Sequence, residues 1–428
     1  MSKVPLEPVA RETPVLATDR LKALLELFPE VACEGRVDVD KLRALLGEAV
    51  DDRPERYAFS WAGKRDAMRV LAEPSRATLI PDRDQSQDFD SSGNVFIEGD
   101  NLEVLKLLYK SYFGRVRMIY IDPPYNTGND FVYPDNFRDP LDTYLKITGQ
   151  RDSEGNLLTS NTDASGRYHS AWLSMMYPRL VLARQLLRED GVICVSMDDS
   201  ESHNLRLLLD EVFGGENHIA TIVWQKRYVS NVTAKWLSDM HDFIFVYARD
   251  AGAVSVVPWE KNEAQLEAYR NPDNDARGPW RAQDLSASKQ YNAGQFTITG
   301  PTGLKFQPPP GRYWRCNEAQ FTSWLSDGRI WWGLDRNSRP MLKAFLSEVG
   351  SEVTPHTWWS HDFAGHNKEA TLELKALFDG MSPFDTPKPV RLLEHLTSLD
   401  NSRASCLKPL LTARKPCKAT ACTLKRDV

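Results

Sequence analysis

Four consecutive residues, Asp122, Pro123, Pro124 and Tyr125, place an acid, two prolines and an aromatic ring directly after an apolar run. The run, residues 116–121, is typical of a strand buried on both faces. Two prolines prevent both strand pairing and helix formation, so the chain must leave the sheet as a stiff loop. The alternative is a surface turn with an incidental tyrosine. Because ligands bind at the carboxyl ends of strands in open α/β sheets, we expect a catalytic loop here.

An acid, a free proline carbonyl and a ring face, without a nucleophile, suit a planar exocyclic amine such as that of adenine. Hydrogen bonds from the amine to the Asp122 carboxylate and the Pro123 carbonyl would favour a more tetrahedral nitrogen. Stacking on Tyr125 contributes about 1–3 kcal/mol and compensates for unstacking the base from a duplex. A methyl group on a sulfonium could then transfer in line, with positioning and electrostatics supplying most of the rate. This chemistry needs no metal and no covalent intermediate.

The elements that must position this loop alternate along the chain from residue 94. We expect strands at residues 95–98, 116–121, 191–199, 219–224 and 243–247, and helices at residues 102–108, 170–187 and 202–213. Gly99, Asp100 and Asn101 form the turn before the first of these helices, where Asp100 either caps the helix or contacts a cofactor. The pattern predicts a doubly wound, mostly parallel α/β sheet as the core, residues 91–250.

The bulk composition limits the class of protein. The chain has 428 residues, 41% hydrophobic and 26% charged, as in soluble proteins of two or three domains. No apolar run is long enough to cross a membrane, and the polar start, residues 1–18, lacks the apolar core of an export signal. The six cysteines show no C-x-x-C spacing and are interpreted as reduced thiols in the cytoplasm. A net charge of −6 means that any nucleic-acid surface must concentrate its cations on one face.

Two segments outside the core differ from it in composition. Residues 1–90 predict a helical accessory segment and a linker. Residues 251–380 are rich in Pro, Gly, Asn and Trp, and nine of the twelve tryptophans follow Lys235. Arginines interleave with aromatic residues at 308–315 and 328–332. These stretches fit either the small core of an irregular β-rich domain or a nucleic-acid surface.

Other polar residues near the predicted strands have structural interpretations. Asp198 and Asp199 are expected to be polar groups at a strand end, and Cys194 to lie in the core. Pro416-Cys417 is discounted as a nucleophile because it lies in an atypical tail. Three histidines lack the spacing of metal ligands, so no metal is assigned to them: His203, His241 and His366.

The loop at Asp122–Tyr125 resembles the catalytic motif of the amino-methyltransferases that act on DNA. The region from about residue 55 to residue 396 is similar to the β-group adenine-specific enzymes, and most of all to the modification (Mod) subunits of type III restriction–modification systems. Further matching stretches are residues 94–129, 172–187, 191–199, 241–247 and 384–389. The resemblance implies that Asp122, Pro123, Pro124 and Tyr125 hold a flipped adenine. An Asp in the first position favours adenine N6 over cytosine N4, where Ser is usual.

The same resemblance implies S-adenosylmethionine as the cofactor, double-stranded DNA as the substrate and a restriction (Res) subunit as a partner of a cytoplasmic Mod homodimer. Its target-recognition domain would be residues 251–380, and residues 381–396 would return to the core. The cofactor-binding residues that it implies are Gly99, Asp100, Asn101, Asp122, Phe384, Thr386 and Lys388.

The chain departs from the family after residue 396. The resemblance requires a Phe-x-Gly-x-Gly strand there, to hold the methionine part of the cofactor, but no glycine follows Gly380. Phe363-Ala364-Gly365 does not supply this strand, because it precedes the matching stretch at residues 384–389, whereas the family signature follows that stretch. We therefore expect residues 397–428 to be disordered sequence, out of frame or foreign, in a truncated methyltransferase. The alternatives are a DNA-binding remnant unable to hold the cofactor, and a methyltransferase for another amine such as a glutamine side chain or an RNA base.

Overall fold

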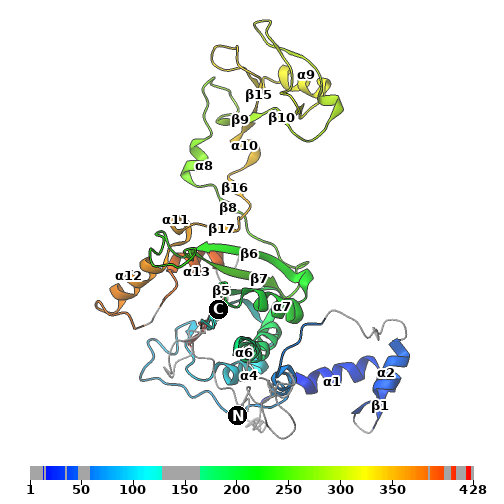
Figure 1. Ribbon diagram of the computed structural model, residues 1–428, viewed down its shortest axis with the longest axis vertical. Coiled ribbons are helices and arrows are strands. Elements are labelled where there is room, and N and C mark those ends of the chain that lie inside the picture. Colours follow the sequence, from blue (N-terminus) through cyan, green and yellow to red (C-terminus); the bar gives the residue numbers. More distant parts are fainter. Residues whose placement is uncertain are drawn as a thin grey trace, which may run out of the picture. The chain divides into compact units, whose positions relative to one another are not determined.

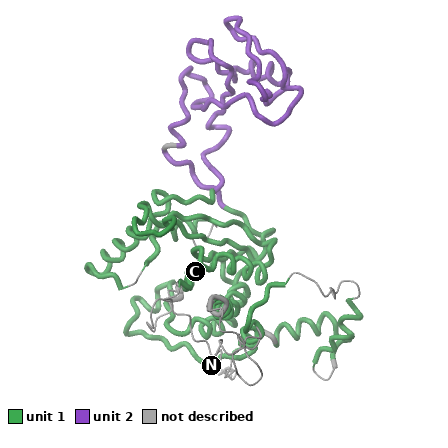
Figure 2. The backbone as a smooth tube through the Cα atoms, viewed as in Figure 1, with its two compact units in different colours: residues 1–256, 356–428 green, residues 257–355 purple. Residues whose placement is uncertain are grey.

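The computed structural model describes residues 13, 16–33, 36–46, 58–127, 164–383, 386–399, 406–410 and 421–425. The chain forms two compact units: residues 1–256 with 356–428 (unit 1), and residues 257–355 (unit 2) (Figure 2). Unit 2 is smaller than the inserted domain expected at residues 251–380. Residues 356–380 belong to unit 1 because strand β17 (Trp358–Trp359) joins its large sheet.

Unit 1 is built on an eight-stranded sheet with the order β17-β6-β7-β5-β4-β18-β19-β3. Besides β17, its strands are β3 (Asn94–Val95), β4 (Val116–Ile121), β5 (Leu187–Met197), β6 (His218–Gln225), β7 (His241–Ala248), β18 (Cys406–Leu410) and β19 (Ala421–Lys425). Strands β17, β6, β7 and β5 are labelled in Figure 1. β7 and β19 are antiparallel to both of their neighbours, and all other pairs are parallel. The remaining strands therefore share one direction, which confirms the mostly parallel α/β sheet.

Unit 1 contains helices that pack beside the sheet (Figure 1) and, at its N-terminal end, helices α1 (Leu16–Leu27) and α2 (Val39–Leu46) that contact the 3-10 turn η1 (Pro29–Val31). The other helices are α3 (Lys64–Val70), α4 (Asn101–Tyr112), α6 (Ala164–Leu186), α7 (Ser202–Phe213), α11 (His361–Ala364), α12 (Asn367–Leu377) and α13 (Val390–Ser398), with a second 3-10 turn, η3 (Gly215–Asn217). α4, α6 and α7 lie together beside the sheet in Figure 1 and share its hydrophobic core. α3 was not predicted. The continuous apolar run of β4 is buried, as expected for a strand covered on both faces.

Two strands come from the tail that we expected to be disordered. β18 pairs in parallel with β4, with Cys406 opposite Met118, and β19 continues the sheet to β3. The expectation therefore differs from the structure for these two segments. Pairing on a strand edge uses backbone N–H and C=O groups, so an atypical side-chain sequence does not prevent it. β3 is also shorter than the strand predicted at residues 95–98.

The N-terminal residues of unit 1 include a small two-stranded sheet, β1 (Ala32–Cys33) with β2 (Arg36–Val37), between α1 and α2. Among the described residues, no helix has both the length and the apolar character required to span a membrane.

Unit 2 is an assembly of short strands around its own core. Its elements are β8 (Trp259–Glu260), α8 (Glu263–Glu267), β9 (Trp280–Asp284), β10 (Ser286–Ala287), η4 (Asn292–Gly294), β11 (Ile298–Thr299), β12 (Lys305–Phe306), β13 (Tyr313–Trp314), α9 (Glu318–Ser326), β14 (Ile330–Trp331), β15 (Met341–Phe345), α10 (Leu346–Val349) and β16 (Glu352–Val353). The largest sheet has the order β14-β15-β9. Trp314 and Trp332 pack in the core, so these two aromatic residues fit the interpretation as a small β-rich core.

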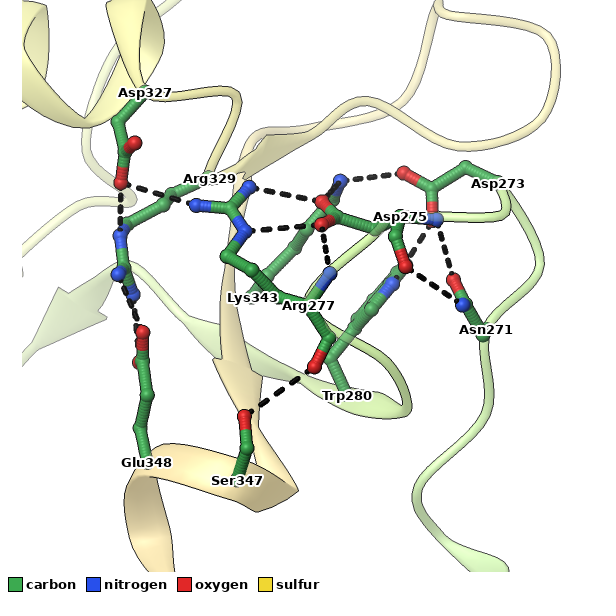
Figure 3. A network of polar contacts seen from close by, with 10 residues as sticks. All are labelled: Asn271, Asp273, Asp275, Arg277, Trp280, Asp327, Arg329, Lys343, Ser347 and Glu348. Atoms are coloured by element: carbon green, nitrogen blue, oxygen red, sulfur yellow. Dashed lines mark hydrogen bonds and ion pairs between the residues drawn. The ribbon is translucent and has the colours of Figure 1, made fainter.

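A network of ion pairs holds the loop before β9 against β15 (Figure 3). Lys343 of β15 is buried and contacts Asp273 and Asp275, and Arg277 binds Asp275 through two nitrogens, each at 2.9 Å. Arg277, with Lys343, holds the pKa of the Asp275 carboxyl well below its usual range. These cations are therefore engaged within unit 2.

Candidate active site

The carboxyl edge of the unit 1 sheet gathers the polar residues of the candidate site. β4, β5 and β6 run in one direction, so Asp122, Asp198 and Lys226, which follow them, lie at the same edge. β7 runs the other way and begins at this edge with His241 and Asp242. In open α/β sheets this is the edge at which ligands bind.

Asp122 is held by a lysine from a distant part of the chain. Lys388, in the loop before α13, places its Nζ atom 2.9 and 2.8 Å from the two carboxylate oxygens of Asp122. Each side chain is only 11% exposed. The Lys388 ammonium also lies 5.1 Å from the centre of the Tyr125 ring. An amine that approaches Asp122 must therefore share or displace this cation.

Tyr125 connects this ion pair to a second one. Its hydroxyl donates to Oδ2 of Asp242 at 3.3 Å, and Lys226 donates to Oδ1 of Asp242 at 2.7 Å. Burial, together with the carboxylates of Asp122 and Asp242, raises the pKa of the Tyr125 phenol well above its usual range, so it remains a donor. Burial also raises the pKa of Asp242, although Lys226 and Lys388 oppose this shift. Tyr125 is thus fixed between two paired carboxylates.

The two proline carbonyls of the loop have different surroundings. The carbonyl of Pro124 accepts a hydrogen bond from the indole N–H of Trp172 at 2.7 Å, and Trp172 is fully buried in α6. No hydrogen bond from the described residues reaches the carbonyl of Pro123. Trp172 therefore anchors the loop, while one buried acceptor beside Asp122 is left for a ligand.

A buried glutamate holds the residue that follows the loop. Asn126 adopts a left-handed conformation with φ of 59°. Its side chain donates to Oε1 of Glu201 at 2.5 Å, and the same oxygen lies 2.7 Å from Nδ1 of His169. Asn204 donates to the other oxygen at 2.8 Å. Glu201 is fully buried, so this contact joins the end of the loop to α6 and α7.

The residues expected to bind a cofactor at the start of α4 are close together. Asp100 caps α4 by accepting the N–H groups of Leu102 and Glu103, each at 3.0 Å, so its role as a cap is present in the structure. Asn101 is buried and accepts a hydrogen bond from Arg179 through Oδ1. Its Nδ2 has no hydrogen-bond partner within the described ranges. Because such a buried donor is costly unless paired, it fits a site completed by a polar ligand.

The second predicted cofactor segment is described only in part. Phe384, like Asp385, lies outside the described residues. Thr386 is exposed with φ of 53°. Lys388 contacts Asp122, and both residues are among those predicted to bind the cofactor. Gly99 precedes the Asp100 cap, and adding a Cβ atom there would meet Val104 at 3.6 Å, an ordinary contact.

The other candidates have local roles. Asp198 accepts the backbone N–H of Ser200 in a turn at 2.9 Å, and Cys194 is buried in β5. In unit 2, Arg312 lies 3.0 Å from Asp284, and Arg315 donates to the backbone oxygen of that residue. Arginines of the 308–315 stretch thus remain partly accessible, although its Trp314 lies in the core.

A model of the DNA methylase family N6_N4_Mtase matches residues 116–399, from β4 to the end of α13. The chain belongs to this family. It is 35% identical over 378 residues to the type III restriction–modification enzyme StyLTI Mod subunit of Salmonella typhimurium, which covers 86% of this chain and 56% of the relative. It is 29% identical to the EcoPI Mod subunit of Escherichia phage P1, over 93% of this chain and 66% of that subunit. The chain thus spans between about half and two thirds of the length of these relatives.

Other similar proteins are more distant. The type II methyltransferase M.KpnI of Klebsiella pneumoniae is 26% identical, over 74% of this chain and 72% of that protein. Among solved structures, the cytosine-N4-specific PvuII DNA methyltransferase has a TM-score of 0.21 at 11% identity, over 35% of this chain and 47% of that one.

Several site residues were missed by the reasoning from sequence. Lys226 and Glu201 carry no motif of their own, and Trp172 was quoted at the start of a matching stretch without a role in the site. Only the position of Lys226, two residues after a predicted strand, could have indicated its place at the sheet edge. Asp242 was quoted within a matching stretch but was given no role.

Proposed function

We propose that this chain is a site-specific DNA methyltransferase that transfers a methyl group to adenine N6, as the modification subunit of a type III restriction–modification system. The observation that carries the proposal is the loop after β4. There, the Asp122 carboxylate, the Pro123 carbonyl, to which no described residue donates, and the Tyr125 ring lie at the carboxyl edge of the sheet. Membership of a DNA methylase family supports the same chemistry.

In the proposed reaction the target adenine leaves the duplex and stacks on Tyr125. Asp122 and the Pro123 carbonyl accept the two hydrogens of its amine, which makes the nitrogen lone pair available. Lys388 would hold the carboxylate in place until the amine takes one of its oxygens. Trp172 holds the Pro124 carbonyl and so keeps the loop rigid during the exchange. Such positioning supplies most of the rate in a transfer without a covalent enzyme intermediate.

The proposed cofactor is S-adenosylmethionine, which supplies an electrophilic methyl group on a sulfonium. The residues that would hold it are Gly99, Asp100 and Asn101, with Thr386 and Phe384 from the second loop. The unpartnered Nδ2 of Asn101 supports this assignment, since it offers a buried donor for a polar group. Asp122 and Lys388, which the resemblance also implies as cofactor-binding residues, contact each other at the edge of the same site.

The proposed partners are double-stranded DNA, a second Mod chain and a Res subunit, in the cytoplasm. The names of the relatives, Mod subunits of type III restriction–modification enzymes, support the part of this proposal that places the chain in such a system. Unit 2 is the proposed target-recognition domain. Its accessible arginines, Arg312 and Arg315, suit phosphate contacts.

A DNA-binding remnant without methyl transfer is the second candidate. One observation favours it, and it concerns β18. This strand pairs in parallel with β4 on the side opposite β5. Its sequence, CLKPL, contains no glycine and places Pro409 opposite Cys422 in the pairing with β19.

The test combines cofactor binding with methylation. The full chain and its Asp122→Ala variant are measured for equilibrium binding of labelled S-adenosylmethionine, and DNA from cells that express them is sequenced for N6-methyladenine. The proposal expects saturable binding and methylation at one recognition sequence, lost in Asp122→Ala. If the chain does not bind S-adenosylmethionine but still binds DNA, the result supports the DNA-binding remnant. Cofactor binding without N6-methyladenine supports another amine as the substrate.

A further inference from the structure

The loop between β6 and β7, residues 226–240, begins at the edge of the candidate active site. Lys226, its first residue, pairs with Asp242, and Asp242 accepts the hydroxyl of Tyr125. Two polar contacts therefore connect the start of this loop to the ring on which the flipped base would stack. The loop has no role in the reaction described above.

The tip of the loop presents three large apolar side chains to solvent. Val232 is 96% exposed, Trp236 is 83% exposed and Leu237 is 92% exposed. Single exposed apolar residues are ordinary on a protein surface, but three on one short loop form a group that gains free energy when it is covered.

The tip is a formed structure with internal hydrogen bonds. Asn231 organises it: its side chain accepts the N–H and the hydroxyl of Thr233 at 3.1 and 2.8 Å, and its own N–H donates to Ser238 at 2.7 Å. At the base of the loop, the N–H of Arg227 donates to the carbonyl of Met240 at 3.3 Å. Because these bonds already fix the loop, little entropy remains to be lost when the tip inserts into a partner.

The charge of the loop indicates the kind of partner. Residues 226–240 contain three cations, Lys226, Arg227 and Lys235, and one acid, Asp239, which pairs with Lys226 at 2.5 Å, so the loop is basic in a chain whose net charge is −6. The Lys235 ammonium lies 5.2 Å from the centre of the Trp236 ring, so a cation flanks the apolar tip. An apolar wedge with cations beside it matches a DNA duplex, in which stacked bases lie between two rows of phosphates.

We propose that the tip of this loop, Val232, Trp236 and Leu237, enters the duplex beside the flipped adenine and fills the gap that the base leaves. The inference rests on the proposed function, because it assigns the loop to the same DNA complex. Extruding a base leaves an unstacked gap, and apolar side chains wedged between base steps cover the exposed ring faces. Arg227 and Lys235 would contact the phosphates on either side of the gap.

The test needs neither the recognition sequence nor methylation. Binding of the full chain is measured by fluorescence anisotropy with two duplexes of one arbitrary sequence, one intact and one with a single abasic site. The abasic duplex offers a gap without the cost of unstacking, so the wild-type chain should bind it more tightly, on the order of tenfold. The tip variant is Trp236→Ser with Leu237→Ser. The matched control is Ile80→Ser with Leu377→Ser, which removes two apolar side chains of comparable exposure, 83% and 75%, elsewhere in unit 1.

The inference expects the tip variant to lose the preference for the abasic duplex, while the control pair keeps it. Equal binding of both duplexes by the wild-type chain, or a preference that survives in the tip variant, would overturn it. A change of oligomeric state in the tip variant with an unchanged preference would also overturn it, and would assign the tip to a contact between chains. Failure of the proposed function is seen separately, as a wild-type chain that shows the abasic preference but methylates no DNA.

Discussion

Replacing Lys388 by methionine tests the ion pair on which the candidate site depends. The substitution keeps most of the apolar stem and removes the ammonium that contacts both oxygens of Asp122. Asp122 would then be a carboxylate with little exposure and without its cation. We expect the free energy of unfolding of unit 1 to fall.

The magnitude follows from the burial of the pair. Removing one partner of a fully buried ion pair costs about 3–5 kcal/mol, because the remaining charge is left uncompensated. Since each side chain here is 11% exposed, water relieves part of this cost, and we expect about 3 kcal/mol. Replacing both partners, Asp122→Asn with Lys388→Met, removes the unpaired charge. The double variant should therefore lose less free energy than the sum of the two single variants.

The assay is equilibrium unfolding in urea for the wild-type chain, the two single variants and the double variant. Arg83 and Asp90 provide the matched control, because they form an ion pair at 2.8 Å whose side chains are 61% and 78% exposed. The control variant Arg83→Met should cost at most about 1 kcal/mol, as exposed pairs do.

Two results would refute the reasoning. If Lys388→Met costs no more than Arg83→Met, the buried pair does not form in solution. If the losses of the two single variants add up to that of the double variant, Lys388 and Asp122 do not interact, and the lysine must serve another group.

Three further predictions concern the anchoring of the loop, the acid sensitivity of unit 2 and thiol reactivity. Trp172→Phe removes the hydrogen bond to the Pro124 carbonyl, worth about 1 kcal/mol, and should slow methyl transfer several-fold without changing the binding of labelled cofactor. Because Arg277 lowers the pKa of Asp275 in the folded chain, this carboxylate stabilises unit 2 above the usual Asp pKa, and the stabilisation is lost as the pH falls below it. Asp275→Asn should thus lower the free energy of unfolding of unit 2 at pH 7, and the variant should lose less of this free energy than the wild-type chain below about pH 4. Unfolding is measured by tryptophan fluorescence. Burial raises the pKa of the Cys316 thiol to about 11, so iodoacetamide at pH 8 should leave it unmodified in the folded chain and modify it in urea, as read by mass spectrometry.

The fold of the core could be predicted because its signals are local. A continuous apolar run followed by two prolines specifies both the strand and its end, and the helices of the core follow from apolar periodicity. Asp100 lies where capping chemistry places it, and the structure shows that cap. The contacts of the site could not be read in the same way. Lys388 and Asp122 are 266 positions apart, and only the return of the chain after unit 2 brings them together.

Unit 2 and the tail were harder to predict for a different reason. Their strands are mostly two residues long, too short for a period of two to appear in the sequence. Arginines and tryptophans also alternate in these stretches. The same pattern would arise if the indole faced a core or if it faced a ligand, so the sequence does not distinguish the two. Trp314 lies in the core and its neighbour Arg315 is exposed, a difference that depends on the register of β13 with β10.

The two ion pairs around Tyr125 explain why this site suits a neutral amine. Asp122 is paired with Lys388, and Asp242 is paired with Lys226, so each of these two carboxylates already has an ammonium group beside it. A neutral adenine can enter such a pocket without burying an additional charge, whereas a cationic amine such as lysine would meet two ammonium groups. The nitrogen becomes positive only as it gains a methyl group, and the Asp122 carboxylate is the anion at hand at that moment. The same pairing therefore favours a neutral substrate and places a negative charge where positive charge develops.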